Sequence, residues 1–93
     1  MKIAYTPGSI DDLKRLREFI EVKNPLAVQR IATSILKGIN QLKTFPYLGI
    51  EVQQAPNPEM VRDLIIGNYI TRYLIRSKKI DILRVWHHKQ DRL

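Results

Sequence analysis

Two stretches of the chain repeat apolar residues every three or four positions, and a proline stands between them. In the first stretch the apolar positions are Ile10, Leu13, Leu16 and Ile20. In the second they are Val28, Ile31, Ile35, Ile39 and Leu42. This spacing predicts two amphipathic helices, each with one buried stripe. Because only Asn24-Pro25 separates them and proline cannot continue a helix, we expect an antiparallel helical hairpin.

Both predicted helices carry capping signals at their starts. Ser9 stands three residues before Asp12. With this spacing Ser9 would accept hydrogen bonds from free backbone amides and Asp12 would reach back, as in a capping box. Pro25 suits the first turn of the second helix, and Asn24 before it would be the N-cap of that helix.

Strand-like alternation replaces the helical period on either side of the hairpin. The predicted strands are residues 2–6, 50–54, 60–66, 69–76 and 80–87. The turns Gly67-Asn68 and Ser77-Lys78-Lys79 are short enough to make the last three strands an antiparallel meander. We therefore predict an α+β fold in a single domain, residues 1–93. It has an N-terminal strand and an antiparallel helical hairpin packed on a three- to four-stranded antiparallel sheet, whose other face is partly exposed.

Residues 82–93, which are the end of the last predicted strand and the tail after it, read ILRVWHHKQDRL and hold the one tryptophan and both histidines of the sequence. Successive side chains of a strand point to opposite faces. Leu83 and Val85 are expected to face the core, which places Arg84 and Trp86 on the uncovered face of the sheet.

The composition excludes several classes of protein. Apolar residues make up 44% of the sequence, as in an ordinary globular domain. The absence of cysteine excludes a disulfide framework, a thiolate zinc site and a cysteine nucleophile, and it fits a reducing compartment. No apolar run approaches the roughly 18 residues of a membrane span, and the first residues lack the apolar stretch of a signal peptide. We expect a cytoplasmic protein that does not contact a membrane.

The charge of the chain points to a partner. Sixteen lysines and arginines stand against nine acidic residues, for a net charge of +7. The excess is uneven, because residues 60–93 hold eight cations and three acids. A basic surface attracts polyanions, either nucleic acid or an acidic protein segment. The asymmetry favours such a partner, and solubility alone is the alternative.

The two histidines could carry acid–base chemistry. Imidazole titrates near neutrality, so His87 or His88 could donate or accept a proton during catalysis. Adjacent strand residues face opposite sides, however, so only one of them would reach a given site. The alternative is a His87 that caps the core and a His88 that lies in solvent.

The arginines and the tryptophan also have two interpretations each. Arg62 and Arg84 could clamp phosphates or carboxylates, or they could pair across the sheet with Asp63 or Asp81. Trp86 could stack on a base or fill a partner's pocket, or it could pack in the core. No Walker loop, dinucleotide fingerprint or nucleophile elbow occurs, and adjacent histidines are a poor metal pair. We expect neither a cofactor nor a metal.

Several segments, in order, resemble the RelE/ParE toxins of bacterial type II toxin–antitoxin modules. The similar segments are TPGSIDDLKRLREFIEVKNPLAVQRIATSI, LKTFPYLGIEV, MVRDLIIGNYITRYLI and IDILRVWHHKQD. Each is a weak signal alone, but their order and spacing together cover nearly the whole chain. The resemblance implies a helix pair over an antiparallel sheet, in agreement with the fold predicted from periodicity.

The resemblance implies one of two activities. RelE-like members cleave messenger RNA on the ribosome, and ParE-like members inhibit DNA gyrase. RelE-type sites have an arginine after the tyrosine of the penultimate strand and commonly a tyrosine near the C-terminus. Here Ile70 follows Tyr69, and no tyrosine follows Tyr73. The ParE-like branch, a plasmid stabilisation protein that causes growth arrest, is therefore favoured. A RelE-type endoribonuclease and an inactive, toxin-derived binding domain are the alternatives.

The resemblance also implies roles for individual residues. The expected gyrase-binding residues are Arg84, Trp86, His88, Lys89, Gln90 and Arg92. The expected binding residues for a cognate antitoxin with an acidic, amphipathic segment are Arg62, Arg72 and Arg76. If the chain were instead a nuclease acting on the ribosome and its mRNA, the catalytic candidates would be Arg62, Arg84, His87 and His88. In either case we expect a hetero-oligomer with the antitoxin.

Overall fold

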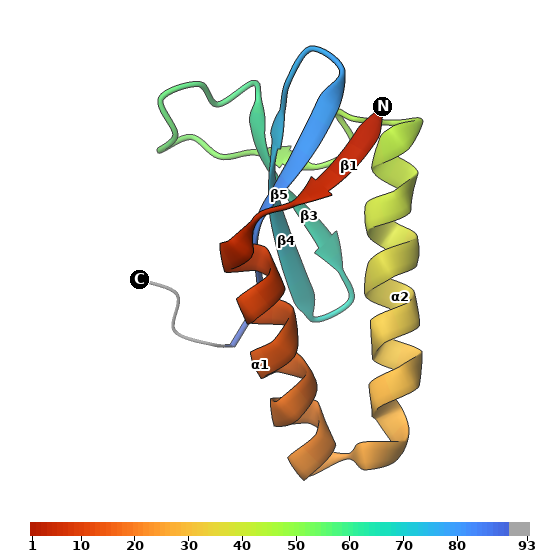
Figure 1. Ribbon diagram of the computed structural model, residues 1–93. Coiled ribbons are helices and arrows are strands. Elements are labelled where there is room, and N and C mark those ends of the chain that lie inside the picture. The colour runs from red at the N-terminus through yellow and green to blue at the C-terminus, as the bar shows by residue number, and fades with distance from the viewer. Residues whose placement is uncertain (90–93) are drawn as a thin grey trace.

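The structure is a computed structural model that describes residues 1–89, and it places two helices on one face of a sheet (Figure 1). The helical elements are α1 (Pro7–Lys23), the 3₁₀ turn η1 (Pro25–Ala27), α2 (Val28–Asn40) and the 3₁₀ turn η2 (Gln41–Lys43). The strands are β1 (Lys2–Tyr5), β2 (Ile50–Glu51), β3 (Val61–Ile66), β4 (Tyr69–Ile75) and β5 (Lys79–His87). The predicted α+β fold, with its N-terminal strand and helical hairpin, is confirmed.

The sheet is larger and more varied than predicted. Its five strands follow the order β1-β5-β4-β3-β2, and β3, β4 and β5 form the expected antiparallel meander. The prediction of a purely antiparallel sheet is corrected by β1, which runs parallel to β5 with Ile3 opposite Ile80. The helical hairpin returns the chain to β1, where the N-terminal amine of Met1 donates to Lys43 O of η2 at 3.4 Å. The connector, residues 44–49, then crosses to β2 at the other edge of the sheet (Figure 1).

The strand predicted over 50–54 shrinks to the two residues of β2. Val52 still donates a backbone hydrogen bond to Val61 O at 3.0 Å, but Ala55 N then bonds back to Val52 O in a turn. Pro56 and Pro58 follow, and proline cannot donate to a strand ladder. The edge of the sheet therefore ends early at this side.

The caps of both helices differ from the prediction. Thr6, not Ser9, is the N-cap of α1, and its Oγ1 accepts a hydrogen bond from Ser9 N at 3.2 Å. Pro7 occupies the first helical turn, where its fixed φ is suitable, so the helix begins before Ser9. Asn24 precedes η1 rather than α2, and its side chain makes no capping hydrogen bond.

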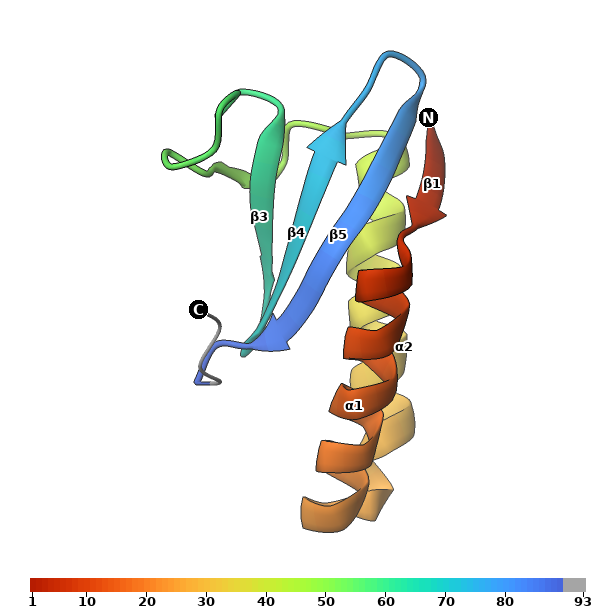
Figure 2. The same ribbon diagram turned by 60° about the vertical axis from the view of Figure 1, so that its left-hand side comes forward.

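The core lies between the helical hairpin and the sheet. Both helices lie on the same side of the sheet, with α1 alongside β5 (Figure 2). The buried apolar side chains of the helical layer are Leu16, Ile20, Ala27, Ile35, Ile39 and Leu42. Those of the sheet are Leu64, Tyr73, Ile75, Ile80, Ile82 and Val85. The far end of the hairpin extends beyond the sheet (Figure 1), where Val22 and Leu26 are 85% and 93% exposed.

A β-bulge in β5 changes which side chains face the core. Arg72 of β4 lies opposite Arg84, but the next residue, Tyr73, lies opposite Ile82. Leu83 is therefore an extra residue, and the side-chain alternation restarts after it. Ile80, Ile82 and Val85 are buried. Val85 therefore faces the core as predicted, whereas Leu83, which was predicted to face it too, is only half-buried.

Candidate functional site

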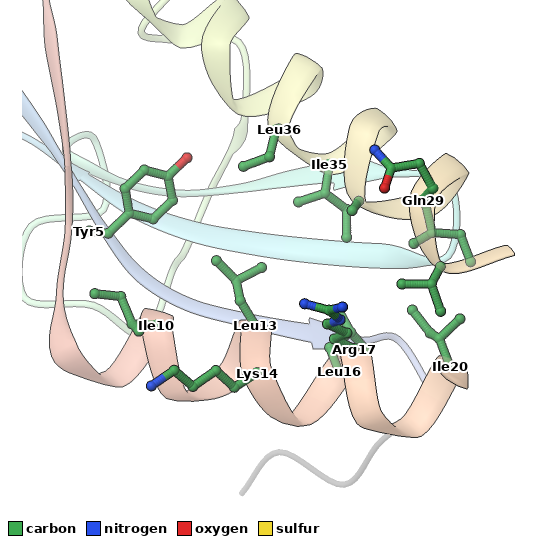
Figure 3. A pocket seen from close by; sticks show the side chains of 13 residues that line it. Tyr5, Ile10, Leu13, Lys14, Leu16, Arg17, Ile20, Gln29, Ile35 and Leu36 are labelled. Atoms are coloured by element: carbon green, nitrogen blue, oxygen red, sulfur yellow. The ribbon is translucent and has the colours of Figure 1, made fainter. Parts of the chain in front are cut away.

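An apolar groove, which we call the helix groove, runs between α1 and α2. Its volume is about 570 Å³, and Figure 3 shows side chains of the two helices facing each other across it. The main apolar lining residues are Tyr5, Ile10, Leu13, Leu16, Ile35 and Leu36. Ile10, which was predicted to be buried, is 42% exposed because it lines this groove rather than the sheet.

The helix groove continues along β1 and is surrounded by positive charge. A second hollow of about 550 Å³ shares Tyr5 and Leu36 with it. The cations that line the two hollows are Lys2, Lys14, Arg17 and Lys43. Such a surface suits a segment that is apolar on one side and acidic at its edges.

Asp12 holds Arg84 against the first turns of α1. Arg84 Nε and Nη2 donate to the two Asp12 oxygens at 2.7 and 3.0 Å, and Val85 N donates to the same carboxylate at 2.9 Å. Burial alone would raise the pKa of Asp12. The hydrogen bonds from Arg84 and Val85 and the charges of Arg84 and Arg15 outweigh it, so this pKa lies below its usual value. The Arg84 side chain remains 57% exposed.

Trp86 lies on the sheet face opposite the helices, next to Arg72. The Arg72 guanidinium is 5.2 Å from the centre of the indole ring, within the range of a cation–π interaction. Its Nε and Nη2 donate to Asp63 at 2.8 and 2.9 Å. Asp63, Arg72 and Arg84 are in register across three strands, so one carboxylate and two guanidinium groups lie in a row across the sheet.

The two histidines lie at the end of β5 and differ in environment. The ring of His87 packs edge-on against Tyr69 at 5.1 Å and lies 6.4 Å from Phe19 of α1. Burial, followed by the charges of His88 and Lys89, lowers the pKa of His87. His88 is exposed and stacks on His87 at 5.1 Å. This matches the alternative in which His87 caps the core and His88 lies in solvent.

Arg62 binds the connector between the helical hairpin and the meander. Its Nη1 donates to the carbonyl oxygens of Tyr47 and Gly49 at 3.2 and 2.9 Å, and its Nε donates to Glu59 O at 2.9 Å. The guanidinium also lies 5.0 Å from the centre of the Tyr47 ring and 3.5 Å from Glu51. These contacts give Arg62 a structural role in holding the connector.

The carboxylates of the sheet pair with arginines other than Arg62 and Arg84, which the sequence offered as their partners. Asp63 pairs with Arg72, and Asp81 pairs with Arg76 at 2.9 Å. Lys79 also approaches Asp81, at 3.7 Å. Neither Arg62 nor Arg84 takes these partners, because Arg62 turns to the connector and Arg84 to α1.

A family comparison identifies the class of protein. The model of the family described as "ParE toxin of type II toxin-antitoxin system, parDE" matches residues 3–92. The chain belongs to the ParE toxin family. It is therefore the toxin component of a ParDE-type toxin–antitoxin system, for which a cognate antitoxin is the implied partner. The resemblance to RelE/ParE toxins seen in the sequence is confirmed.

Two known proteins are similar to the chain over nearly its full length. Toxin RelE2 of Caulobacter vibrioides is 27% identical over 86 residues, which cover 92% of this chain and 93% of the relative. A chain from the solved structure of the chromosomal ParDE toxin–antitoxin system of P. aeruginosa superimposes with a TM-score of 0.78 at 20% identity. That match covers 94% of this chain and 95% of the other, and it shows that the two share a fold.

Four of the residues expected to bind the target of this ParE-family toxin belong to the end of β5 and the turn that follows it. Arg84 and Trp86 are in the last part of β5, and His88 and Lys89 form the turn after it. Gln90 and Arg92, the other two, lie outside the described residues. The role of the whole set stays a prediction.

The three arginines expected to bind the antitoxin do not form one patch. Arg62 lies opposite the buried Tyr73, on the sheet face that the helices cover. Arg72 and Arg76 alternate with buried Tyr73 and Ile75, so they belong to the other face. Their role in antitoxin binding stays a prediction, and none of the three lines the helix groove.

Asp12 is the functional candidate that the sequence analysis missed, because a capping role accounted for it. A signal was present in its spacing, since Ser9, Asp12, Leu16 and Ile20 recur every three or four residues and are the buried residues of α1. A carboxylate on the buried stripe of a helix needs a partner. The spacing therefore indicates a buried ion pair, although it does not identify Arg84.

In the described part of this ParE-family chain, no helix is long and apolar enough to cross a membrane. Within residues 1–89, no three or more His, Cys, Asp or Glu side chains gather where they could hold a metal ion.

Proposed function

We propose that this ParE-family toxin arrests growth by binding DNA gyrase through the end of β5, and that its antitoxin neutralises it by docking in the helix groove. One observation favours a toxin that acts by binding over one that cleaves RNA: the side chains that RNA cleavage would need lie apart from one another. That reaction requires proton transfer and charge stabilisation at one site.

The nuclease candidates face different parts of the molecule. Arg62 is on the helix-covered face and binds the connector, whereas Arg84 is bound to α1. His87 packs against Phe19 and Tyr69, on a different side of the molecule from the connector that Arg62 binds. This separation within the described residues disfavours an endoribonuclease built on these side chains.

The proposed gyrase-binding surface combines exposed polar groups with a half-buried indole. Arg84 presents an exposed guanidinium, Trp86 an indole beside Arg72, and His88 and Lys89 are exposed in the turn. Arginine and tryptophan are the residue types that most often dominate protein–protein binding energy. A contact surface of this kind supports inhibition by binding rather than by chemistry.

The antitoxin site is supported by the shape and charge of the helix groove. Leu36 and Ile10 are half exposed along an apolar floor, and Lys14 and Arg17 lie beside them (Figure 3). An acidic, amphipathic helix would bury its apolar side chains there and place its carboxylates near these cations. The bound antitoxin would add to the modest stability of a domain of this size.

A gyrase supercoiling assay with purified toxin tests the proposal. We expect wild-type toxin to block supercoiling, the antitoxin to relieve the block, and Arg84→Ala to weaken inhibition about tenfold or more, as for loss of an interface hot spot. Arg30→Ala, which removes an exposed cation from α2, is the matched control and should inhibit normally.

Two outcomes would contradict the gyrase target. If supercoiling continues while the toxin still stops growth and mRNA is cut at codon-phased positions, the activity is that of a ribosome-dependent endoribonuclease. If expression without antitoxin is harmless, the chain is a toxin-derived domain that only binds its partner.

A further inference from the structure

The side chains of Thr6, the N-cap of α1, and Asp12 supply hydrogen-bond partners to the backbone along the open edge of β5. β1 pairs with β5 only as far as Tyr5 opposite Ile82, so the backbone of β5 has no neighbouring strand on that side beyond this point. Thr6 Oγ1 donates to Ile82 O at 2.8 Å, and the Asp12 carboxylate accepts from Val85 N at 2.9 Å. Asp12 therefore has one structural role, which is to accept the hydrogen bond of the buried Val85 amide.

The same carboxylate also orients the side chain of Arg84. It receives Arg84 Nε and Nη2 in a two-bond arrangement at 2.7 and 3.0 Å, which fixes the plane of the guanidinium. The Arg84 stem also passes over Gly8, where an added Cβ would lie 3.7 Å from Cδ. An arginine that would otherwise sample many rotamers is thus held in one orientation on the surface.

The orientation leaves the other edge of the guanidinium unused by Asp12. Arginine has five N–H donors in a planar fork, and Asp12 takes the side formed by Nε and Nη2. Nη1 and the second N–H of Nη2 form the end-on edge, and 57% of the side chain is exposed. That edge suits a planar pair of oxygens such as a carboxylate.

We propose that Asp12 is a positioning residue, which presents the end-on edge of Arg84 to a carboxylate on the target of the toxin. The inference rests on the proposed function, in which Arg84 belongs to the target-binding surface. Holding a long side chain in its bound conformation before binding removes the ordering that association would otherwise require. Loss of Asp12 should therefore weaken target binding while Arg84 itself is still present.

A double-mutant cycle between Asp12→Asn and Arg84→Ala tests the inference. Asparagine retains an oxygen for Val85 N but removes the charge and the two-bond contact to Arg84. Two toxin doses are measured, one for half-maximal growth arrest and one for half-maximal gyrase inhibition. Melting temperature and antitoxin affinity serve as checks on folding. Asp11→Asn, at an exposed neighbouring position, is the matched control.

We expect Asp12→Asn to raise both doses about tenfold, to leave antitoxin affinity within about twofold, and to add nothing in the Arg84→Ala background. Arg84→Lys retains the charge, but an ammonium group cannot bind the Asp12 carboxylate and a target carboxylate with two hydrogen bonds each. The doses that it requires should therefore resemble those of Arg84→Ala. This second variant changes the exposed partner of the pair and does not disturb the buried amide of Val85.

Three results would overturn the inference. The first is that Asp12→Asn requires the same toxin doses as wild type. The second is that the double variant requires a higher dose than Arg84→Ala alone, so that the two effects are independent. The third is that Asp12→Asn lowers antitoxin affinity and melting temperature along with activity, which would indicate a role in folding alone. The growth-arrest cycle does not depend on the target. If wild-type toxin arrests growth without inhibiting gyrase, the gyrase proposal fails and the coupling of Asp12 to Arg84 is still measured.

Discussion

Each arginine of the sheet is bound to a carboxylate of the same chain. Arg72 and Arg84 make two-bond contacts, with Asp63 and Asp12, and Arg76 bonds to Asp81 at 2.9 Å. The side chains of Asp63, Asp81 and Asp12 are only 22%, 12% and 7% exposed, and these pairs fix where the guanidinium groups point. An acidic partner that approaches these arginines must therefore compete with carboxylates already in place.

Tyr73 is the residue on which the connector depends. It is fully buried, and its hydroxyl accepts a hydrogen bond from Gly49 N and donates one to Pro46 O, both at 2.8 Å. We expect Tyr73→Phe to lower the free energy of unfolding by about 1–3 kcal/mol, because a buried amide loses its partner. Urea unfolding followed by circular dichroism measures the change.

The control for Tyr73 is Tyr47→Phe. Tyr47 is 55% exposed, and the substitution retains the ring that lies beside Arg62, so the unfolding free energy should change by less than about 0.5 kcal/mol. Equal effects of the two substitutions would mean that the Tyr73 hydroxyl does not stabilise the connector.

At the scale of elements, the helical hairpin and the meander follow from local signals. Leu16, Ile20, Ile35 and Ile39 lie on the predicted stripes and are buried, because helical periodicity directly reflects one face turned to a core. The Asn24-Pro25 break also lies where predicted, although a 3₁₀ turn intervenes before α2. Such features depend on neighbours in sequence, so the sequence alone reveals them.

The features that the sequence did not predict depend on contacts between distant segments. The parallel pairing of β1 with β5 joins residues more than seventy positions apart, and no local pattern selects it. The bulge at Leu83 inverts the faces deduced from strict alternation. Asp12 was assigned to a cap because the sequence shows spacing along α1 but not the amide of Val85. The candidate site consists largely of these long-range contacts.

The helix groove is an element-scale feature because two helices form it together. We expect Leu36→Glu to weaken antitoxin binding by about 10- to 100-fold, since it places a charge on the apolar floor that an acidic segment would have to bury. Titration calorimetry with the antitoxin measures the affinity, and gyrase inhibition by the free variant should be unchanged.

The matched control for the groove is Leu26→Glu. Leu26 is 93% exposed at the far end of the hairpin and does not line the groove, so the same substitution there should leave antitoxin affinity near that of wild type. If both variants bind the antitoxin equally well, the antitoxin docks elsewhere, and the arginines of the sheet become the next surface to test.

At the scale of the whole molecule, positive charge is distributed over several surfaces. The net charge is +7, and cations occur along the helix groove as well as on the sheet, where Lys78 lies in the turn between β4 and β5. Such a field acts over distances longer than any single contact and steers an acidic partner during its approach. Its effect should therefore appear in the rate of association.

Ionic strength separates this long-range attraction from the contacts made in the complex. We expect the association rate constant for the antitoxin to fall by about tenfold or more between about 0.05 and 0.5 M salt, because the screening length shrinks from above roughly 10 Å to a few ångströms. The dissociation rate constant should change little, since the apolar floor of the helix groove is not screened. Surface plasmon resonance gives both constants.

Two charge-reversal variants locate the origin of the steering. Lys14→Glu changes the charge beside the groove and Lys78→Glu changes it in the β4–β5 turn, by the same amount. If the field of the whole molecule guides the antitoxin, both variants should associate more slowly than wild type at low salt and converge with it at high salt. If only Lys14→Glu is slower, attraction is local to the groove. An association rate that does not respond to salt in wild type would show that the +7 charge does not guide this partner.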